Sequence, residues 1–243
     1  MKDIRGIKRS IRERIWRLME EKDIARFPRP VFGRIPNFVG AERAAENLRK
    51  TAEWKKSETI FVNPDSPQKQ VRFFALVDSK KLIMASPRIK KGFILLDPNH
   101  IKPAVYHHAV TIRGAFRYGK IVEPQQIDYI DMKVAGCVAV DPKGGRLGKG
   151  HGYSDLEWGI LSEFGLVDDK TVTATTVHDM QIVEEIPMTS HDFPIDIIAT
   201  PTKVIYTNTP YKKPKGIFWE EAMERVDEIP LLYQLCVRKG LCK

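Results

Sequence analysis

Apolar residues near the N-terminus recur three and four positions apart. This spacing puts side chains on one face of an α-helix, and the positions between them carry many arginine and lysine residues. The pattern predicts an amphipathic helix from about Asp3 to Lys22 with a basic outer face. Its apolar positions are Ile4, Ile7, Ile11, Ile15 and Leu18.

The next segment is rich in proline and glycine. The stretch FPRPVFGRIPNFVG (27–40) contains three prolines and two glycines, a composition that ends helices and favours a structured loop. The sequence AERAAENLRKTA (41–52) then predicts a short helix. We treat residues 26–56 as a Pro/Arg-rich loop and short helix inserted into the main domain.

From Thr59 onward, apolar runs alternate with amphipathic segments. The alternation predicts an α/β protein whose mainly parallel sheet is covered by helices on both faces. We expect one α/β domain over residues 1–207, followed by a Pro/Lys linker and a C-terminal helical extension over 208–243. The segments that carry the alternation are TIFVN, QKQVRFFALVDS, KLIMAS, FILLD, PAVYHHAVTIRG, YIDMKVAGCVAV, DLEWGILSEFG, TVTATTV, IDIIAT and KVIYT.

The composition of the chain indicates which partners it binds and in which compartment it is found. The formal net charge of +9 over 243 residues favours anionic partners such as nucleotides, polyglutamates, RNA or acidic lipid surfaces. The three cysteines are an odd number without CxxC spacing, which argues against disulfides and thiolate metal sites and predicts a reduced, intracellular protein. No apolar run approaches the roughly 20 residues that span a bilayer. We expect a cytoplasmic protein with no membrane partner.

The stretch GGRLGKGHGYSDLEW (144–158) is the strongest candidate for a ligand site. It holds five glycines within nine residues and lies between a predicted buried strand and a predicted helix. Such a turn can cradle phosphate with backbone N–H groups at a helix N-terminus. Arg146, Lys149 and His151 add positive charge. The spacing matches neither the P-loop nor the GxGxxG pattern, so a plain strand-to-helix loop remains an alternative.

Two acids and two bases elsewhere suit the same ligand. Asp155 begins the helix after the glycine-rich stretch, and Asp192 precedes an apolar strand in SHDFPIDIIATP. Either is a common turn or capping residue, but beside phosphates a carboxylate can hold Mg²⁺. Lys8 and Arg12 lie four positions apart, so both project from one side of the first helix. They form either a phosphate clamp or a solvated cationic face.

Other candidates for chemistry are weaker. His107 and His108 are adjacent and lack the spacing of a zinc site, so we expect structural roles. The segment VHD (177–179) follows a strand, but the chain shows no Ser or Cys nucleophile with the context of a catalytic triad. A triad hydrolase is therefore not expected.

Taken in order, KRSIR (8–12), GGRLGKGHGYSDLE (144–157) and HDFPIDIIATP (191–201) resemble the 5-formyltetrahydrofolate cyclo-ligase family, also called methenyltetrahydrofolate synthetase. The segments FPRPV, RIPNF, VHDMQIV and TPTKVI resemble its methenyltetrahydrofolate synthetase domain-containing branch. The resemblance covers about residues 3–205. It implies a Rossmann-like, three-layer α/β/α domain with a mainly parallel sheet, of the NagB/RpiA/CoA transferase-like type.

The resemblance also implies ATP, Mg²⁺ and a reduced folate, 5-formyltetrahydrofolate, as ligands. The family reaction phosphorylates the formyl oxygen, after which N10 closes the 5,10-methenyl ring. Asp155 and Asp192 are then expected at Mg²⁺, Tyr153 beside the folate, and Arg146 and Lys149 as catalytic residues at the transferring phosphoryl group. The residues implied to bind ATP are Lys8, Arg12, Arg146, Leu147, Gly148, Lys149, Gly150, His151, Gly152, Tyr153 and Ser154.

This chain departs from the family pattern at two places. Ser154 stands where the family usually has a second tyrosine. The segment PDSPQKQ (64–70) contains no glutamate where the family's folate-contacting glutamate is expected. The nucleotide half of the site is therefore better supported than the folate half, and the substrate is expected to be a folate, a modified folate or a pterin.

Two other functions remain open at this point. The charge of +9 and the arginine and aromatic residues of the 27–40 loop are compatible with a nucleotide- or RNA-binding protein without cyclo-ligase activity. Nucleic acid is not the favoured partner, because the sequence lacks RRM and KH motifs. A sugar-phosphate isomerase of similar fold rests on analogy alone.

Overall fold

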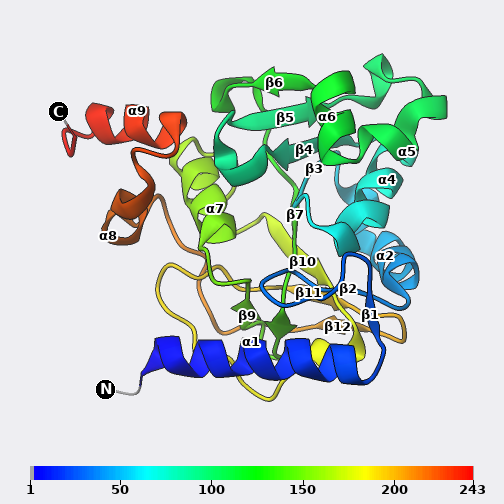
Figure 1. Cartoon of the computed structure of the whole chain (residues 1–243). Coiled ribbons are helices and arrows are strands. Elements are labelled where there is room, and N and C mark those ends of the chain that lie inside the picture. The colour runs from blue at the N-terminus through cyan, green and yellow to red at the C-terminus, as the bar shows by residue number, and fades with distance from the viewer. Residues whose placement is uncertain (1–2, 243) are drawn as a thin grey trace.

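An eight-stranded sheet runs through the centre of the computed structural model, which describes residues 3–242 (Figure 1). The strand order is β12-β11-β10-β7-β3-β4-β5-β6. The five strands from β11 to β4 are parallel to one another, while β12, β5 and β6 pair antiparallel at the edges. The strands are β3 (Thr59–Val62), β4 (Lys81–Ala85), β5 (Phe93–Leu96), β6 (Lys120–Val122), β7 (Met132–Ala135), β10 (Val172–Thr176), β11 (Ile197–Ala199) and β12 (Val204–Tyr206).

The predicted mainly parallel α/β sheet is confirmed, and two of its three antiparallel pairings follow from short connections. The connections from β4 to β5 and from β11 to β12 are too short for the crossover that a parallel pair needs, so each pair forms a hairpin. The stretch YIDMKVAGCVAV, predicted as one strand, is interrupted at Gly136. Its second part, β8 (Ala139–Val140), leaves the main sheet and pairs with β9 (Arg146–Leu147).

Helices cover both faces of the sheet, as Figure 1 shows. On β3, Ile60 packs into a core with Leu48 of α2, while Phe61 points to the opposite core with Trp158 of α7. This alternation follows from the two-residue period of a strand and produces three layers. One side carries α2 (Ala41–Arg49), α4 (Lys69–Val77), α5 (Tyr106–Ala109) and α6 (Ile112–Tyr118), and the other carries α7 (Tyr153–Glu163), α8 (Trp219–Ala222) and α9 (Pro230–Arg238). The short α3 (Ala52–Lys56) follows α2.

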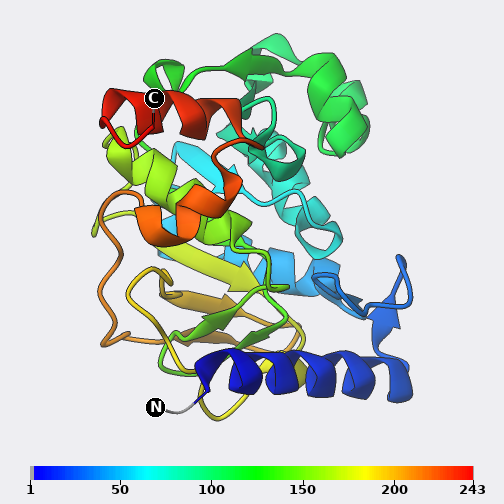
Figure 2. The ribbon, with the colours of Figure 1, turned by 60° about the vertical axis from the view of Figure 1, so that its left-hand side comes forward.

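The predicted N-terminal helix is confirmed as α1 (Ile4–Glu21), whose N-cap is Asp3. Its buried face packs on the β8–β9 hairpin in a third, smaller core, and in Figures 1 and 2 the helix lies along one end of the molecule. Ile4 and Ile7 are exposed, so the apolar stripe extends beyond the core it covers. Within residues 3–242, neither α1 nor any other helix combines the length and apolarity needed to cross a membrane.

The loop over residues 27–40 is tied to α1. Glu20 accepts two hydrogen bonds from the Arg29 guanidinium and one from the backbone N–H of Val31, at 2.7–2.9 Å. The indole of Trp16 donates to the carbonyl of Arg34 at 2.9 Å. The loop is bounded by the two-stranded ribbon of β1 (Ala25–Arg26) and β2 (Asn37–Phe38). Its Val31, Ile35 and Phe38 side chains are buried in the third core, and the hydrogen bonds to α1 satisfy backbone groups of the loop.

The C-terminal segment packs against α7 (Figure 2). Ile217, Val226 and Leu232 are buried in the same core as Trp158, whose indole donates to the carbonyl of Pro214 at 2.8 Å. The part of the predicted extension that the structure describes, residues 208–242, therefore buries one face of α7. The separate boundary at residue 207 remains a prediction.

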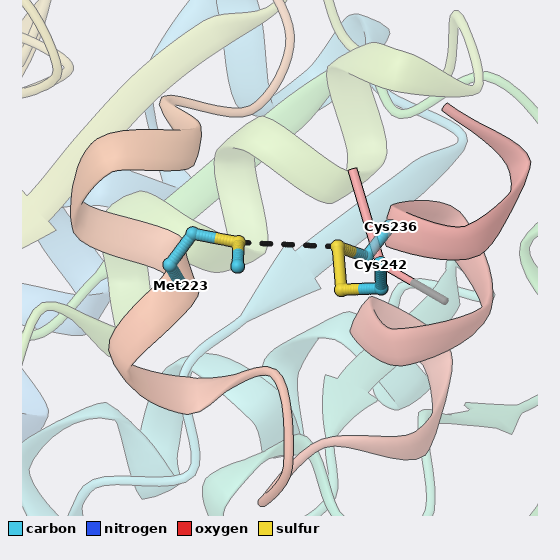
Figure 3. The surroundings of a disulfide bond; sticks show 3 residues. All are labelled: Met223, Cys236 and Cys242. Atoms are coloured by element: carbon cyan, nitrogen blue, oxygen red, sulfur yellow. Dashed lines mark hydrogen bonds between the residues drawn. A yellow bond between two sulfur atoms is a disulfide. The ribbon is translucent and has the colours of Figure 1, made fainter. Parts of the chain in front are cut away.

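The expectation that the cysteines form no disulfide is wrong for one pair. Cys236 and Cys242 are disulfide-bonded, next to the sulfur of Met223 (Figure 3). The chain reverses after α9 through Gly240, which has a positive φ of 71°, and this turn brings the two Cα atoms to 5.3 Å. Cys137 is free and buried.

Candidate functional site

The glycine-rich stretch turns sharply into helix α7 at the sheet edge formed by the carboxyl ends of β3 and β7. Gly150 and Gly152 have φ values of 101° and 70°, a region that residues with a β-carbon rarely adopt. Gly152 is the N-cap of α7 and supplies no capping side chain. The first-turn N–H groups of α7 are therefore available to an anion, which the positive end of the helix favours.

Helix α1 brings its two predicted cations to this stretch. The Lys8 ammonium lies 2.6 Å from an Asp192 carboxylate oxygen, and the Arg12 guanidinium donates to the carbonyl of Gly148 at 2.7 Å. The side chains of Lys8 and Asp192 are only 13% and 8% exposed. Burial alone raises the pKa of Asp192, but the charge of Lys8 and hydrogen bonds from Thr189 hold it below its ordinary value. The two cations thus reach the site and do not form a solvated face.

Asp155 lies close to the second predicted carboxylate. The Arg146 guanidinium forms an ion pair with Asp155, and the backbone N–H of Phe193, the residue after Asp192, donates to Asp155 at 3.4 Å. Arg146 is nearly buried, and its guanidinium also covers the Phe193 ring at 4.1 Å. Burial lowers the pKa of Arg146, yet the charge of Asp155 raises it above its ordinary value. The buried guanidinium is already paired in this structure.

The two carboxylates predicted to hold a metal, Asp155 and Asp192, are ion-paired in this structure with Arg146 and Lys8. Residues 3–242 contain no group of three or more His, Cys, Asp and Glu side chains able to hold an ion by themselves. Mg²⁺ bound with a nucleotide ordinarily takes one or two protein carboxylates and fills its shell with phosphate oxygens and water. Two hard oxygen donors on adjacent segments fit that requirement.

Lys149 and His151 lie at the open side of the stretch. The Lys149 ammonium is 3.4 Å from an Asp65 carboxylate oxygen. Burial lowers the pKa of His151, and nearby positive charges lower it further. Those charges belong to Lys149, Arg225, Arg88 and Arg12. The mouth of the site is therefore strongly cationic and suits a polyanion.

Of the remaining residues predicted to bind ligands, some can offer only their backbone and others their side chains. The Leu147 side chain is buried in the third core, so only its backbone can face a ligand. The Ser154 hydroxyl donates to the side-chain oxygen of Asn63 at 3.1 Å. The Tyr153 ring lies under the Arg225 guanidinium at 4.5 Å, and its hydroxyl donates to Glu228 at 3.1 Å. The C-terminal extension thus borders the position predicted for the folate.

A buried polar network behind the loop was not predicted. The Glu157 carboxylate accepts hydrogen bonds from the side chains of Asn63 at 2.7 Å and Lys133 at 2.9 Å. Asn63 in turn accepts from Ser154 and from the backbone N–H of Gly136. Burial lowers the pKa of Lys133, whose side chain is fully buried. The signal in the sequence was a lysine inside the apolar strand MKVA and a glutamate inside the apolar helix DLEWGIL.

Two further residues, Asp65 and Arg225, were missed for different reasons. Asp65 follows β3 in the segment that lacks the family's glutamate, and a carboxylate just beyond a buried parallel strand was the available signal. Arg225 belongs to the C-terminal extension, and no local pattern links it to Tyr153. Its position is set by the packing of α8 and α9 on α7.

The sequence matches the model of the 5-formyltetrahydrofolate cyclo-ligase family over residues 5–201. It is 41% identical over 233 residues to the methenyltetrahydrofolate synthase domain-containing protein of Bos taurus, covering 94% of this chain and 61% of that protein. The Mus musculus protein of the same name is 40% identical over 237 residues, covering 96% of this chain and 64% of that protein. The chain thus spans somewhat over three-fifths of the length of these relatives.

A solved structure supports the fold. The NMR structure of Aquifex aeolicus 5,10-methenyltetrahydrofolate synthetase superposes with a TM-score of 0.52 at 21% identity, covering 85% of this chain and 95% of that one. At this identity the likeness concerns the fold alone. The family match over most of the chain is independent of it. The chain belongs to the 5-formyltetrahydrofolate cyclo-ligase family.

Proposed function

We propose that this chain is an ATP- and Mg²⁺-dependent 5-formyltetrahydrofolate cyclo-ligase. Family membership supports the folate chemistry. The observation that carries the nucleotide half is the convergence of Lys8, Arg12, Asp155 and Asp192 on one glycine-rich turn. Residues far apart in the sequence gather there around an uncapped helix N-terminus, an arrangement suited to a triphosphate.

The reaction needs no nucleophilic side chain. The formyl oxygen of 5-formyltetrahydrofolate takes the γ-phosphoryl group of ATP and ADP leaves; N10 of the folate then attacks the activated carbon, and phosphate departs as the 5,10-methenyl ring closes. The protein has to align the two substrates and stabilise the charge that spreads over the transferring group. This agrees with a site made of cations, backbone N–H groups and carboxylates.

The position of each residue determines whether it binds phosphate, stabilises the transferring group or holds the metal. Lys8 and Arg12 grip the phosphates from α1, and Lys149 stabilises the transferring group from the open side. Asp155 and Asp192 hold Mg²⁺, which neutralises phosphate charge when it is bound. Lys8, the cationic partner of Asp192, is then free to turn to the phosphates.

Arg146 and Tyr153 act at the borders of the site. The nearly buried Arg146 orients Asp155, with which it is already paired, and its charge adds to the field at the phosphates. Tyr153 borders the folate beside Arg225 of the extension. The pairing of Arg146 with Asp155 supports a positioning role for Arg146, in place of the direct contact with the phosphoryl group that the resemblance implies.

The test is a spectrophotometric assay with purified chain, 5-formyltetrahydrofolate, ATP and Mg²⁺. The expected result is the methenyl chromophore with one ADP for each product formed, and no product when ATP or Mg²⁺ is omitted. Running the assay with several folates and pterins identifies the accepted formyl donor. If ATP binds but neither ADP nor chromophore forms with any of them, the chain is a nucleotide-binding protein without this activity.

A further inference from the structure

Three segments of the chain converge on Glu228 of the C-terminal extension. The Tyr153 hydroxyl, at the start of α7, donates to the Glu228 carboxylate at 3.1 Å. The guanidinium of Arg88, which follows β4, lies 3.3 Å from the same carboxylate, and that of Arg225 lies 3.7 Å from it. Partial burial raises the pKa of Glu228, but the Tyr153 hydrogen bond and the Arg88 charge hold it below its ordinary value. The carboxylate is therefore ionised at neutral pH.

The extension holds Tyr153 both at its ring and at its hydroxyl. The Arg225 guanidinium covers the ring at 4.5 Å from the centroid and also donates to the phenol oxygen at 3.3 Å. A carboxylate can only accept, so the hydroxyl proton points to Glu228 and an oxygen lone pair points to Arg225. A ring in the first turn of a helix has several rotamers open to it. Three contacts from the extension select one of them.

This cluster lies at the mouth of the candidate site. The Tyr153 ring is 6.4 Å from the ring of His151 in the glycine-rich stretch, and the charges of Arg225 and Arg88 both lower the pKa of His151, after burial and Lys149. The extension lies beyond residues 5–201, which match the family model. A segment outside the family match therefore contacts a residue that is expected beside the folate.

The backbone that presents Arg88 is a second, independent sign of a built site. Arg88 and Ile89 have φ values of 55° and 57°, and a β-branched residue rarely adopts such a conformation. The Ile89 side chain is buried in the core that also contains Val226 and Ile229 of the extension. Strained backbone persists where the surrounding packing enforces it, and it is frequent at ligand sites. The extension and this turn are thus packed together on both sides of Glu228.

We propose that Arg225 and Glu228 are positioning residues that fix the Tyr153 ring for the substrate, so that the extension is part of the active site. The identification of that substrate as a reduced folate rests on the proposed function. A ring that is already held in place loses little conformational entropy when the ligand binds, so affinity rises without a further contact. Arg88 holds Glu228 from the side opposite to its own helix.

The experiment measures binding to the full chain by isothermal titration calorimetry, with 5-formyltetrahydrofolate and a non-hydrolysable ATP analogue as probes. Arg225→Ala and Glu228→Ala change the net charge in opposite directions, yet both release Tyr153. Both should weaken folate binding about three- to tenfold, through the lost ordering of the ring. Both probes are anions, so charge alone would weaken binding in Arg225→Ala and strengthen it in Glu228→Ala. ATP-analogue binding should follow that opposite pattern, by about twofold or less.

A double-mutant cycle tests whether the effect passes through Tyr153. Tyr153→Phe removes the hydroxyl and should weaken folate binding. In this background Glu228→Ala should have almost no further effect, because the hydrogen bond that it breaks is already absent. Arg225→Lys keeps a cation beside the ring and Glu228→Gln keeps an acceptor, so each should recover most of the wild-type affinity.

Matched substitutions control for charge and folding. Glu220→Ala and Arg238→Ala make the same charge changes at exposed side chains of the same extension. They should leave folate binding unchanged. Thermal melting accompanies each variant, so that affinities are compared only among folded proteins.

The outcomes separate this proposal from the proposed function. Opposite shifts of folate affinity in Arg225→Ala and Glu228→Ala, or independent effects of Glu228→Ala and Tyr153→Phe, overturn the positioning role even if the wild type makes methenyl product. Coupled losses in a chain that binds folate but makes no product support the positioning role and contradict the cyclo-ligase activity. A wild type that binds no folate overturns both.

Discussion

Lys8 and Asp192 form an ion pair of 2.6 Å that joins the first helix to a loop 184 residues later. Asp192 also accepts hydrogen bonds from the backbone N–H and hydroxyl of Thr189, at 2.8 and 2.7 Å. Because the pair is nearly buried, it holds α1 in position over the glycine-rich turn. The same ion pair therefore joins two predicted site residues and fixes the helix that carries one of them.

Lys8→Ala is expected to weaken binding of a non-hydrolysable ATP analogue about tenfold or more, since a charge-assisted contact to phosphate is lost. Lys8→Arg keeps the charge and should lose less. Arg5→Ala removes an exposed cation from the same helix and serves as the control. Equal losses for Lys8→Ala and Arg5→Ala would mean that only the general charge of the helix matters.

Lys149→Ala should lower kcat for methenyl formation by about a hundredfold or more, because a cation aimed at developing charge is removed. The fold should persist, since the Lys149 side chain is 37% exposed and its ion pair with Asp65, at 3.4 Å, is partly open to solvent. The measurement is steady-state kinetics together with thermal melting. Lys143→Ala, which removes an exposed lysine near the same stretch, should leave kcat unchanged; full activity of Lys149→Ala would remove the catalytic role.

How much of this site follows from the sequence depends on how local its signals are. The α1 spacing and the glycine-rich stretch are local patterns, so the helix carrying Lys8 and the turn before α7 were both predictable. The pairing of Lys8 with Asp192 was not, because the sequence gives no distance between segments so far apart. Family resemblance, and not spacing, linked them.

Some features were not predicted because they depend on tertiary packing, and the disulfide was not predicted because the number of cysteines is odd. An odd number of cysteines suggested none were paired, yet the turn at Gly240 joins Cys236 to Cys242 and leaves Cys137 buried. The prediction for residues 64–70 rested on a missing glutamate and made no use of the aspartate and glutamine that the segment does contain. Gln68 is fully buried and its amide nitrogen donates to the carbonyl and hydroxyl of Thr176, a contact that exists only once β3 and β10 are assembled in one sheet.

His151 should report anion binding through its protonation. Burial and the surrounding cations lower its pKa, so the imidazole is neutral at pH 7 in the free protein. A bound triphosphate adds negative charge nearby and should raise this pKa, with uptake of protons near neutral pH. An NMR titration of the histidine C–H signals, assigned with His151→Gln, measures the change. An unchanged His151 pKa at saturating ATP analogue would place the triphosphate away from the glycine-rich stretch.

Asp78 provides a test of stability against pH away from the site. Burial alone raises the pKa of Asp78, but hydrogen bonds from Arg49, at 2.5 and 2.8 Å, and from the Trp54 indole, at 2.8 Å, hold it below the ordinary value of 3.8. Asp78→Asn should therefore lower the free energy of unfolding by about 1–2 kcal/mol at pH 7, where hydrogen bonds to a carboxylate are fully formed.

The sign of the pH effect follows from the lowered pKa of Asp78. The carboxylate stabilises the fold above the unfolded-state pKa, and this stabilisation is lost as the pH falls through the lower folded-state pKa. The difference between wild type and Asp78→Asn should thus close below about pH 4. Urea unfolding at several pH values measures it, with Asp128→Asn as the control, because its ion pair with Lys81 is exposed. A difference that stays constant down to pH 2 would contradict an ionic origin.

Cys137 should be inert to alkylation in the native protein. Burial raises the pKa of its thiol to about 11, so the reactive thiolate is scarce at pH 7–8 and the sulfur is inaccessible. Treatment with iodoacetamide followed by mass spectrometry should find no label on any cysteine, because Cys236 and Cys242 are paired. After mild reduction those two should be labelled first, and Cys137 only in denaturant. Rapid labelling of Cys137 in the folded chain would show that the segment between β7 and β8 opens readily, and that the polar network beside it is not a fixed support for the site.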